Sequence, residues 1–277
     1  MSVIEGALRR AGISLNPNAQ IMVVDPSISG ELQSAIDNAV GGNGDHIFVE
    51  RGGHEVSATV NFDKSGISVI AVADGLAPLM RGEFNAVFSA DGFTDGPAVN
   101  IKAPCYVEGM GFASRDVGAT FFSGAACLIG EFGLTTPVGA YLKNCRFPKW
   151  ALSNRIGLAI EGSTDVTIDE CSFEGVGTDF EAGIYIQGAM QNIHILRNTF
   201  RQCIAAVKSG QFAGGGPHLM MGHNVVEDGL ILDTQGFTGT GIIYDNWSEL
   251  DAGSSYDAVV GTLQTNGWQI SGNHYKE

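Results

Sequence analysis

Two glutamates, Glu174 and Glu227, are the strongest candidates for catalytic chemistry in this chain of 277 residues. Each directly follows an apolar phrase that recurs along the sequence. If the phrases stack as coils, the two carboxylates lie two coils, or about 9–10 Å, apart, close to the roughly 6.5–9.5 Å that inverting glycosidases use. Arg201 occupies the same position on the coil between them, and a cation there stabilises both charged carboxylates and removes the general acid. The pattern therefore favours a charged column on a solvated face, and we predict no catalytic residue.

Other polar positions also predict structural roles. One column of the repeat alternates in charge, and we expect the pairs Glu170–Arg197 and His223–Asp245 to be neighbours of opposite charge; its members are Asn144, Glu170, Arg197, His223 and Asp245. Glu161 and Asp233 follow strands three coils apart, which is too far for a catalytic pair. Residues 91–96 (DGFTDG) lack the ligand pattern of a calcium loop and indicate a plain turn. We predict no metal and no cofactor.

These side chains are positioned by a repeat of about 26 residues. The phrases are LKNCRF at 142–147, IDECSF at 168–173, ILRNTF at 195–200, MGHNVV at 221–226, IYDNWS at 243–248 and ISGNHY at 270–275, with a weaker copy, VEGMGF, at 107–112. Further short β runs precede the phrases, at 139–142, 157–160, 183–186, 205–207, 229–232 and 258–260. Alternating apolar residues predict strands, and a period of this length predicts stacked units that share one core.

The fourth position of the phrase supports this stacking. It holds two cysteines and then four asparagines: Cys145, Cys171, Asn198, Asn224, Asn246 and Asn273. Asparagine is unfavourable inside strands, but on coils about 4.8 Å apart four amides can bond their neighbours above and below. Cys145 and Cys171 would then lie near disulfide distance, but we favour two buried free thiols that fill positions of the column. None of the five cysteines forms a pair with metal-ligand spacing.

The phrases TIDECSF and HILRNTF, and the entry segment from Leu32 to Val72, resemble the right-handed parallel β-helix, or pectate-lyase-like, superfamily. The resemblance covers about residues 29–277. It implies an all-β fold, a right-handed single-stranded parallel β-helix of about 26 residues per coil, with a capping helix at about 30–40. Enzymes of the superfamily cleave complex or acidic polysaccharides, but the tripled aspartate motif of its polygalacturonase-like hydrolases is missing here. Function belongs to sites and not to folds.

The net charge is −15, with a pI near 4.6. Without a basic stripe, nucleic-acid binding is disfavoured. The sequence contains no run of 18 apolar residues, so no membrane span is predicted. The N-terminus lacks the pattern of a secretory signal, so we expect synthesis in the host cytoplasm. Trp150, Trp247 and Trp268 are candidate sugar-stacking platforms, although aromatic residues mark interfaces equally well.

Residues 1–28 are predicted to form a docking arm ahead of the β-helix at 29–277. The arm has a short amphipathic helix at 2–12, with a capping box from Ser2 to Glu5 and a stop at Gly12. A helix this short needs a docking surface, either on its own solenoid or on a partner. Together with the resemblance, this predicts a non-enzymatic phage or virus structural protein: a capsid decoration, head fibre or tail spike. We expect a homotrimer attached to capsid or tail proteins through the arm. A lyase, a hydrolase or a glycan-binding solenoid is the alternative.

Overall fold

The computed structural model describes residues 18–25, 28–73, 77–78, 85–89, 96–113, 125–130, 138–148, 156–175, 181–188, 190–209, 218–233, 240–250, 255–256, 264 and 267–276. Four predicted features lie outside these ranges: the helix at 2–12, residues 91–95 of the expected turn, Trp150 and the strand at 258–260.

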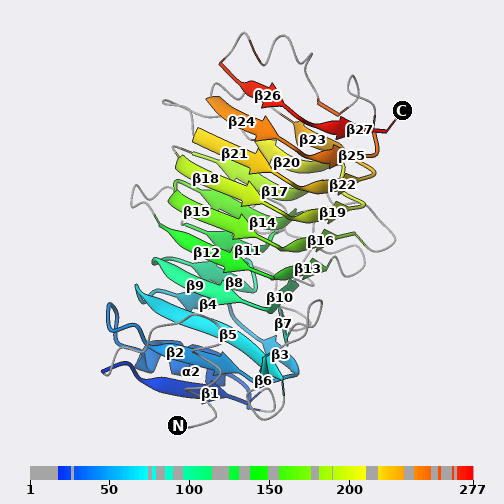
Figure 1. Cartoon of the computed structure of the whole chain (residues 1–277). Coiled ribbons are helices and arrows are strands. Elements are labelled where there is room, and N and C mark those ends of the chain that lie inside the picture. The colour runs from blue at the N-terminus through cyan, green and yellow to red at the C-terminus, as the bar shows by residue number, and fades with distance from the viewer. Residues whose placement is uncertain are drawn as a thin grey trace.

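The chain winds into a solenoid in which successive coils add strands to three parallel sheets, as Figure 1 shows. This confirms the predicted fold, because each sheet is built from strands one repeat apart. Sheet A contains, in spatial order, β1 (Ile21–Val24), β2 (His46–Val49), β5 (Ile67–Ala73), β9 (Cys105–Glu108), β12 (Ala140–Lys143), β15 (Thr164–Asp169), β18 (Gln191–Leu196), β21 (His218–Gly222), β24 (Thr240–Tyr244) and β26 (Gln269–Ser271), and β6 (Ala77–Pro78) pairs antiparallel with β5.

The other two sheets complete the coils. Sheet B contains β3 (Gly53–Val56), β7 (Asn85–Ser89), β10 (Met110–Ala113), β13 (Arg146–Pro148), β16 (Ser172–Glu174), β19 (Thr199–Arg201), β22 (Val225–Glu227), β25 (Trp247–Ser248) and β27 (His274–Tyr275). Sheet C contains β4 (Val60–Phe62), β8 (Val99–Ile101), β11 (Ala125–Ile129), β14 (Ile156–Glu161), β17 (Ala182–Gln187), β20 (Ala205–Ser209) and β23 (Leu230–Asp233). Each phrase thus spans a sheet A strand, a turn and a sheet B strand. The run at 139–142 belongs to sheet A itself and not to the preceding strand set, which forms sheet C.

The helix α2 (Glu31–Asn38) lies over the N-terminal end of the solenoid, where Figure 1 places it beside β1 and β2. It matches the capping helix predicted at about 30–40. Gly30 precedes it with φ 78°, a left-handed conformation that glycine adopts without steric cost. Leu32, Ala35 and Ile36 are buried against the first coil, so α2 covers the apolar end that an open solenoid would expose to water.

The interior is a continuous apolar column. The final positions of the phrases place phenylalanines over one another in sheet B. The ring centroids of Phe147 and Phe173 are 4.5 Å apart and those of Phe173 and Phe200 are 4.8 Å apart, with nearly parallel planes. A side chain at Gly183 would meet the Phe200 ring at 2.6 Å, so this glycine makes room for the stack.

Asparagines form a second column, at the start of the sheet B strands. The Oδ1 of Asn224 accepts hydrogen bonds from the backbone N–H of Asn198 (2.9 Å) and from its Nδ2 (3.0 Å). The same two bonds join Asn224 to Asn246 and Asn246 to Asn273. Each Nδ2 also donates to a backbone carbonyl, such as that of Ile195 for Asn224 (2.9 Å). Three of the four residues are buried, and a buried amide is stable only with such partners.

The turns between sheets A and B are left-handed. The residue before each Asn or Cys of the column has a positive φ. It is 66° for Gly272, before Asn273, and between 49° and 56° for the other five, which are Asn144, Glu170, Arg197, His223 and Asp245. Positive φ is uncommon outside glycine, and Asn and Asp adopt it most readily. Glu, Arg and His at three of these positions show that the stacked coils impose the turn.

Candidate functional site

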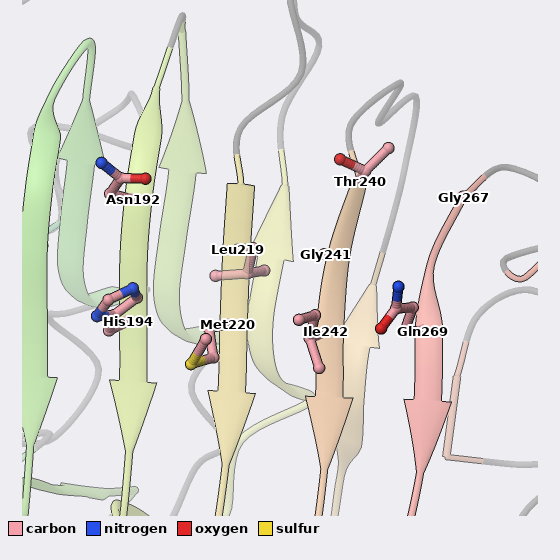
Figure 2. A pocket seen from close by; sticks show the side chains of 9 residues that line it. All are labelled: Asn192, His194, Leu219, Met220, Thr240, Gly241, Ile242, Gly267 and Gln269. Atoms are coloured by element: carbon pink, nitrogen blue, oxygen red, sulfur yellow. The ribbon is translucent and has the colours of Figure 1, made fainter.

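A shallow groove of about 280 Å³ crosses the outer face of sheet A in the C-terminal part of the solenoid. Figure 2 shows the nine residues that line it, which are Asn192, His194, Leu219, Met220, Thr240, Gly241, Ile242, Gly267 and Gln269. They come from β18, β21, β24 and β26 and the approach to β26. The groove is therefore assembled by four successive coils.

The floor of the groove is a single row of register partners. His194 pairs with Met220, Met220 with Ile242, and Ile242 with Gln269. Strand spacing of about 4.8 Å makes this row about 14 Å long, parallel to the solenoid axis. Ile242 is 36% exposed and the neighbouring Met220 is partly exposed, so the centre of the row presents apolar surface. The row combines an apolar centre with a polar residue at each end.

The rim of the groove supplies polar groups. Asn192 Nδ2 donates a hydrogen bond to Asp165 Oδ1 (2.9 Å), and Figure 2 shows its Oδ1 on the side of β21. Asn192, Thr240 and Gln269 are exposed. An amide or hydroxyl can both donate and accept hydrogen bonds, so the rim can bind ligand hydroxyl groups as donors or as acceptors.

A glycine and a tryptophan shape the groove from beneath. Gly241 follows Leu219 in the inward-facing row of sheet A, and a Cβ there would lie 2.4 Å from the Leu219 carbonyl oxygen and 2.5 Å from the Trp268 ring. Trp268 is buried. The sequence made Trp268 a candidate sugar-stacking platform, and its burial excludes that role.

A polar network lies on the same face, toward the N-terminus. The row of His194 continues through Thr167 and Tyr141 to Tyr106. The Tyr141 hydroxyl donates to Asp169 Oδ2 (3.0 Å), and Arg197 binds both oxygens of Asp169, with Nε at 2.9 Å from Oδ1. Such a bidentate pair is strong and directional. Partial burial, together with the Asp169 contact, raises the pKa of Tyr141 to about 12, so Tyr141 is a donor and not a base at neutral pH.

Comparison with known proteins agrees with this architecture. A model of the right-handed β-helix region matches residues 133–274, about half of the chain. The chain belongs to the right-handed β-helix family. A search among curated proteins finds no match.

Solved structures share the fold of this β-helix at low identity. A pectin methylesterase in complex with a hexasaccharide is 12% identical over 88% of this chain and 81% of that chain, with a TM-score of 0.51. A PL6 family alginate lyase is 13% identical over 94% of this chain and 41% of that chain, with a TM-score of 0.50. A bacteriophage CBA120 tailspike protein is 14% identical over 92% of this chain and 46% of that chain, with a TM-score of 0.38. At these identities the matches to the pectin methylesterase and the alginate lyase show the fold alone.

The β-helix keeps Glu174 and Glu227 away from the groove. Both lie on sheet B, in register with Arg201 between them. The expectation that Arg201 is shared by the two glutamates is wrong in detail. Arg201 Nε lies 3.0 Å from Glu227, while Glu174 pairs with Arg146 of the preceding coil. Each carboxylate thus pairs with its own arginine, as expected of a structural column of charges on the surface.

The second charged column agrees with its prediction in part. Glu170 and Arg197 form the expected ion pair, with Arg197 Nε 3.9 Å from the carboxylate, although Arg197 bonds chiefly with Asp169. His223 packs edge-on against Tyr244, with ring centroids 5.1 Å apart, and no ion pair with Asp245 is found among the described residues. Asp169 itself was not predicted. It lies on an outward row beside Lys143, one position before the column that sequence reasoning compared.

Glu161 and Asp233 stay apart, as predicted, because β17 and β20 separate their strands in sheet C. Asp233 and Glu181 instead hold Lys208, whose Nζ lies 3.5 Å and 3.1 Å from their carboxylates. Burial opposes the charge on Lys208, but these contacts outweigh it and raise the Lys208 pKa. This arrangement has the character of a structural ion cluster.

The cysteines of the β-helix are all free and buried. The backbone N–H of Cys145 donates to Cys171 Sγ (3.3 Å), and Cys171 N–H donates to Asn198 Oδ1 (2.8 Å). The two thiols therefore extend the asparagine column toward the N-terminus. Burial raises the pKa of Cys171 and raises that of Cys105 to about 12, so neither is a reactive nucleophile at neutral pH.

In the part of the chain that the structure describes, His, Cys, Asp and Glu side chains nowhere gather in threes around a possible metal ion. No helix within those ranges has the length and hydrophobicity to span a bilayer.

Sequence reasoning missed the groove, although its floor leaves a signal. His194, Met220, Ile242 and Gln269 each stand directly before a phrase, at 195, 221, 243 and 270. Tyr106, Tyr141 and Thr167 hold the same position in earlier repeats. Since neighbouring residues of a strand face opposite sides, the residue before each inward Ile, Leu or Met faces outward. Aligning the repeats at that position would have predicted the row.

Proposed function

We propose that this β-helix is a non-catalytic surface protein of a phage or virus particle, a tail spike, head fibre or capsid decoration, and that it assembles as a homotrimer. The observation that carries the non-catalytic part is the lining of the groove. Its nine residues include no carboxylate, lysine or arginine, and His194 is the only titratable side chain among them. Glycoside hydrolysis requires two carboxyl groups on either side of the scissile bond, and the groove offers neither.

The N-terminal end of the solenoid supports attachment there. Four apolar side chains around β1 and α2 are between 38% and 52% exposed; these are Ile21, Val23, Val40 and Ile28. Ile21 and Val23 share one face of β1, and exposed apolar residues that lie together mark interaction sites. In the sequence, Ile21 and Val23 closely follow residues 1–17, which are predicted to contain an amphipathic docking helix. A partner bound at this end leaves the rest of the solenoid projecting.

A polysaccharide-degrading enzyme is the second candidate, and the polar network on sheet A is the observation that favours it. Carboxylate, guanidinium and phenol groups meet there, at Asp169, Arg197 and Tyr141. Against turnover, Asp169 is only 1% exposed and both of its oxygens accept hydrogen bonds from Tyr141 or Arg197, so a substrate has little access to this carboxylate.

Two measurements test the proposal. The first incubates the full chain with panels of neutral and acidic polysaccharides and assays new reducing ends and unsaturated uronates, with Glu174→Gln, Glu227→Gln and Asp169→Asn as controls. We expect no turnover, and turnover that any of these variants abolishes would establish the enzyme instead. The second measures mass in solution by light scattering. We expect a trimer that Ile21→Lys and Val23→Lys weaken and that Ile204→Lys, at an exposed site in mid-solenoid, leaves intact.

A further inference from the structure

The groove on sheet A has the composition of a carbohydrate site. Met220 and Ile242 give it an apolar floor, on which the C–H face of a sugar ring can pack. Asn192, Thr240 and Gln269 stand around that floor with exposed amide and hydroxyl groups, as Figure 2 shows. A few convergent polar groups around an apolar surface are what orients and selects a small ligand.

The charge around the groove selects between classes of carbohydrate. None of the lining residues is acidic or basic apart from His194, and the whole chain carries a net charge of −15. The guanidinium of Arg197, which follows β18, is bound to Asp169 and close to Glu170. A polymer of uronic acids would meet general repulsion and no cation to offset it. An uncharged ligand pays no such penalty.

The shape of the floor sets the direction of the ligand. The row from His194 to Gln269 crosses the strands at right angles and is about 14 Å long at ordinary strand spacing. Thr167 and then Tyr141, which is 37% exposed, continue the same row toward the N-terminus. A linear chain lying along the solenoid axis can therefore contact one outward side chain per coil.

We propose that this groove binds a neutral oligosaccharide, laid along the solenoid axis over Met220 and Ile242. This inference rests on the proposed function, a solenoid that binds without cleaving. It makes the groove the surface through which the particle would recognise a carbohydrate receptor.

Isothermal titration calorimetry on the full chain tests this inference. The probes are hexasaccharides of cellulose, xylan, dextran and β-galactan on one side, and hexagalacturonate and hexamannuronate on the other. We expect at least one neutral probe to bind, and both acidic probes to bind at least tenfold more weakly at pH 7.5. Ile242→Asp and Met220→Asp should each weaken the neutral probe at least tenfold. Ile242→Gln, which keeps volume without charge, should weaken it less.

The matched control is Trp247→Ala, which removes an exposed aromatic from sheet B, away from the groove. Trp247→Ala should leave the affinity for the neutral probe unchanged. The melting temperature of each variant is measured to check that the variant is folded. Tighter binding of an acidic probe, or loss of binding in Trp247→Ala with Ile242→Asp unaffected, overturns the assignment. If no probe binds and no product appears, the inference fails while the non-catalytic function stands. If product appears, the proposed function fails whichever probe binds.

Discussion

The ring of Trp268 occupies the space that a side chain at Gly241 would fill, with a built Cβ only 2.5 Å from it. The indole lies beneath the groove, and the missing side chain lets it pack into the inward row of sheet A. Gly241 and Trp268 therefore act as one packing unit at the C-terminal end of the core.

Gly241→Ala should destabilise the protein by about 1–3 kcal/mol, the usual cost of overpacking a core, because the new methyl group also meets a backbone oxygen at 2.4 Å. Denaturant unfolding measures this change. Gly139→Ala is the matched control, since its Cβ would find only ordinary contacts at 3.6 Å or more. A loss of stability in the control equal to that in Gly241→Ala would refute the packing argument.

Asn224→Ala removes the acceptor for two donors of Asn198 and the Nδ2 group that donates to Ile195 O and Asn246 Oδ1. Each buried group left without a partner costs about 1–3 kcal/mol, so we expect a loss of several kcal/mol. Asn273→Ala should cost less, because its site is partly exposed and water can replace the amide. Chemical denaturation of both variants tests this order, and the reverse order would contradict it.

Arg197→Gln and Arg201→Gln should differ sharply. Arg201 pairs with a glutamate that is 29% exposed, and exposed pairs contribute about 0–1 kcal/mol. Arg197 compensates the buried Asp169, and an uncompensated buried carboxylate is strongly destabilising. Melting temperatures should fall clearly for Arg197→Gln and hardly for Arg201→Gln. Restoration by the double variant Arg197→Gln/Asp169→Asn would show that the charge is the cause.

Much of the fold was predictable because its signals repeat. Alternating apolar residues recur along the repeats, and the position held by Cys or Asn recurs on six successive coils, so weak local preferences add up. The capping helix α2 was expected from the resemblance of the entry segment that begins at Leu32. The left-handed turns were not, because Glu170, Arg197 and His223 have little preference for positive φ and adopt it under the constraint of stacking. The groove escaped because Met220 and Ile242 are ordinary strand residues. Only their common outward position, on coils far apart in sequence, makes them a surface.

Stability should decrease as the pH falls from about 7.5 to 5. His46 and His54 are buried in the first coil, and His46 Nδ1 and Nε2 have no hydrogen-bond partner among the described residues. Burial lowers the pKa of both below the ordinary value of 6.5, and the charges of Asp45 near His46 and of Glu31 and Asp25 near His54 offset this only in part. A lowered folded-state pKa means that the unfolded chain takes up protons first. Stability is thus complete above about pH 6.5 and declines below it.

The variant His46→Phe/His54→Phe should flatten this dependence between pH 7.5 and 5. Unfolding free energies of both proteins at the two pH values provide the measurement. An equally steep decline in the double variant would assign the pH dependence to other groups.

The five cysteines should resist thiol reagents in the native protein, because each is buried and free and thiolate formation is disfavoured there. Titration with a chromogenic disulfide reagent should detect almost no thiol under native conditions and all five in urea. Rapid native labelling of any cysteine would show that its coil opens readily.

The asparagine column also has a direction. Every Asn Oδ1 accepts hydrogen bonds from the coil before it and none from the coil after it. Each asparagine therefore makes the same hydrogen bonds to its neighbours in the column. Removing or duplicating one whole repeat between Asn198 and Asn246 would rejoin identical donors and acceptors. Solenoids of this kind can therefore change length over evolution by gene-segment duplication without redesigning the interior, and a receptor-binding surface on their flank would grow by the same increments.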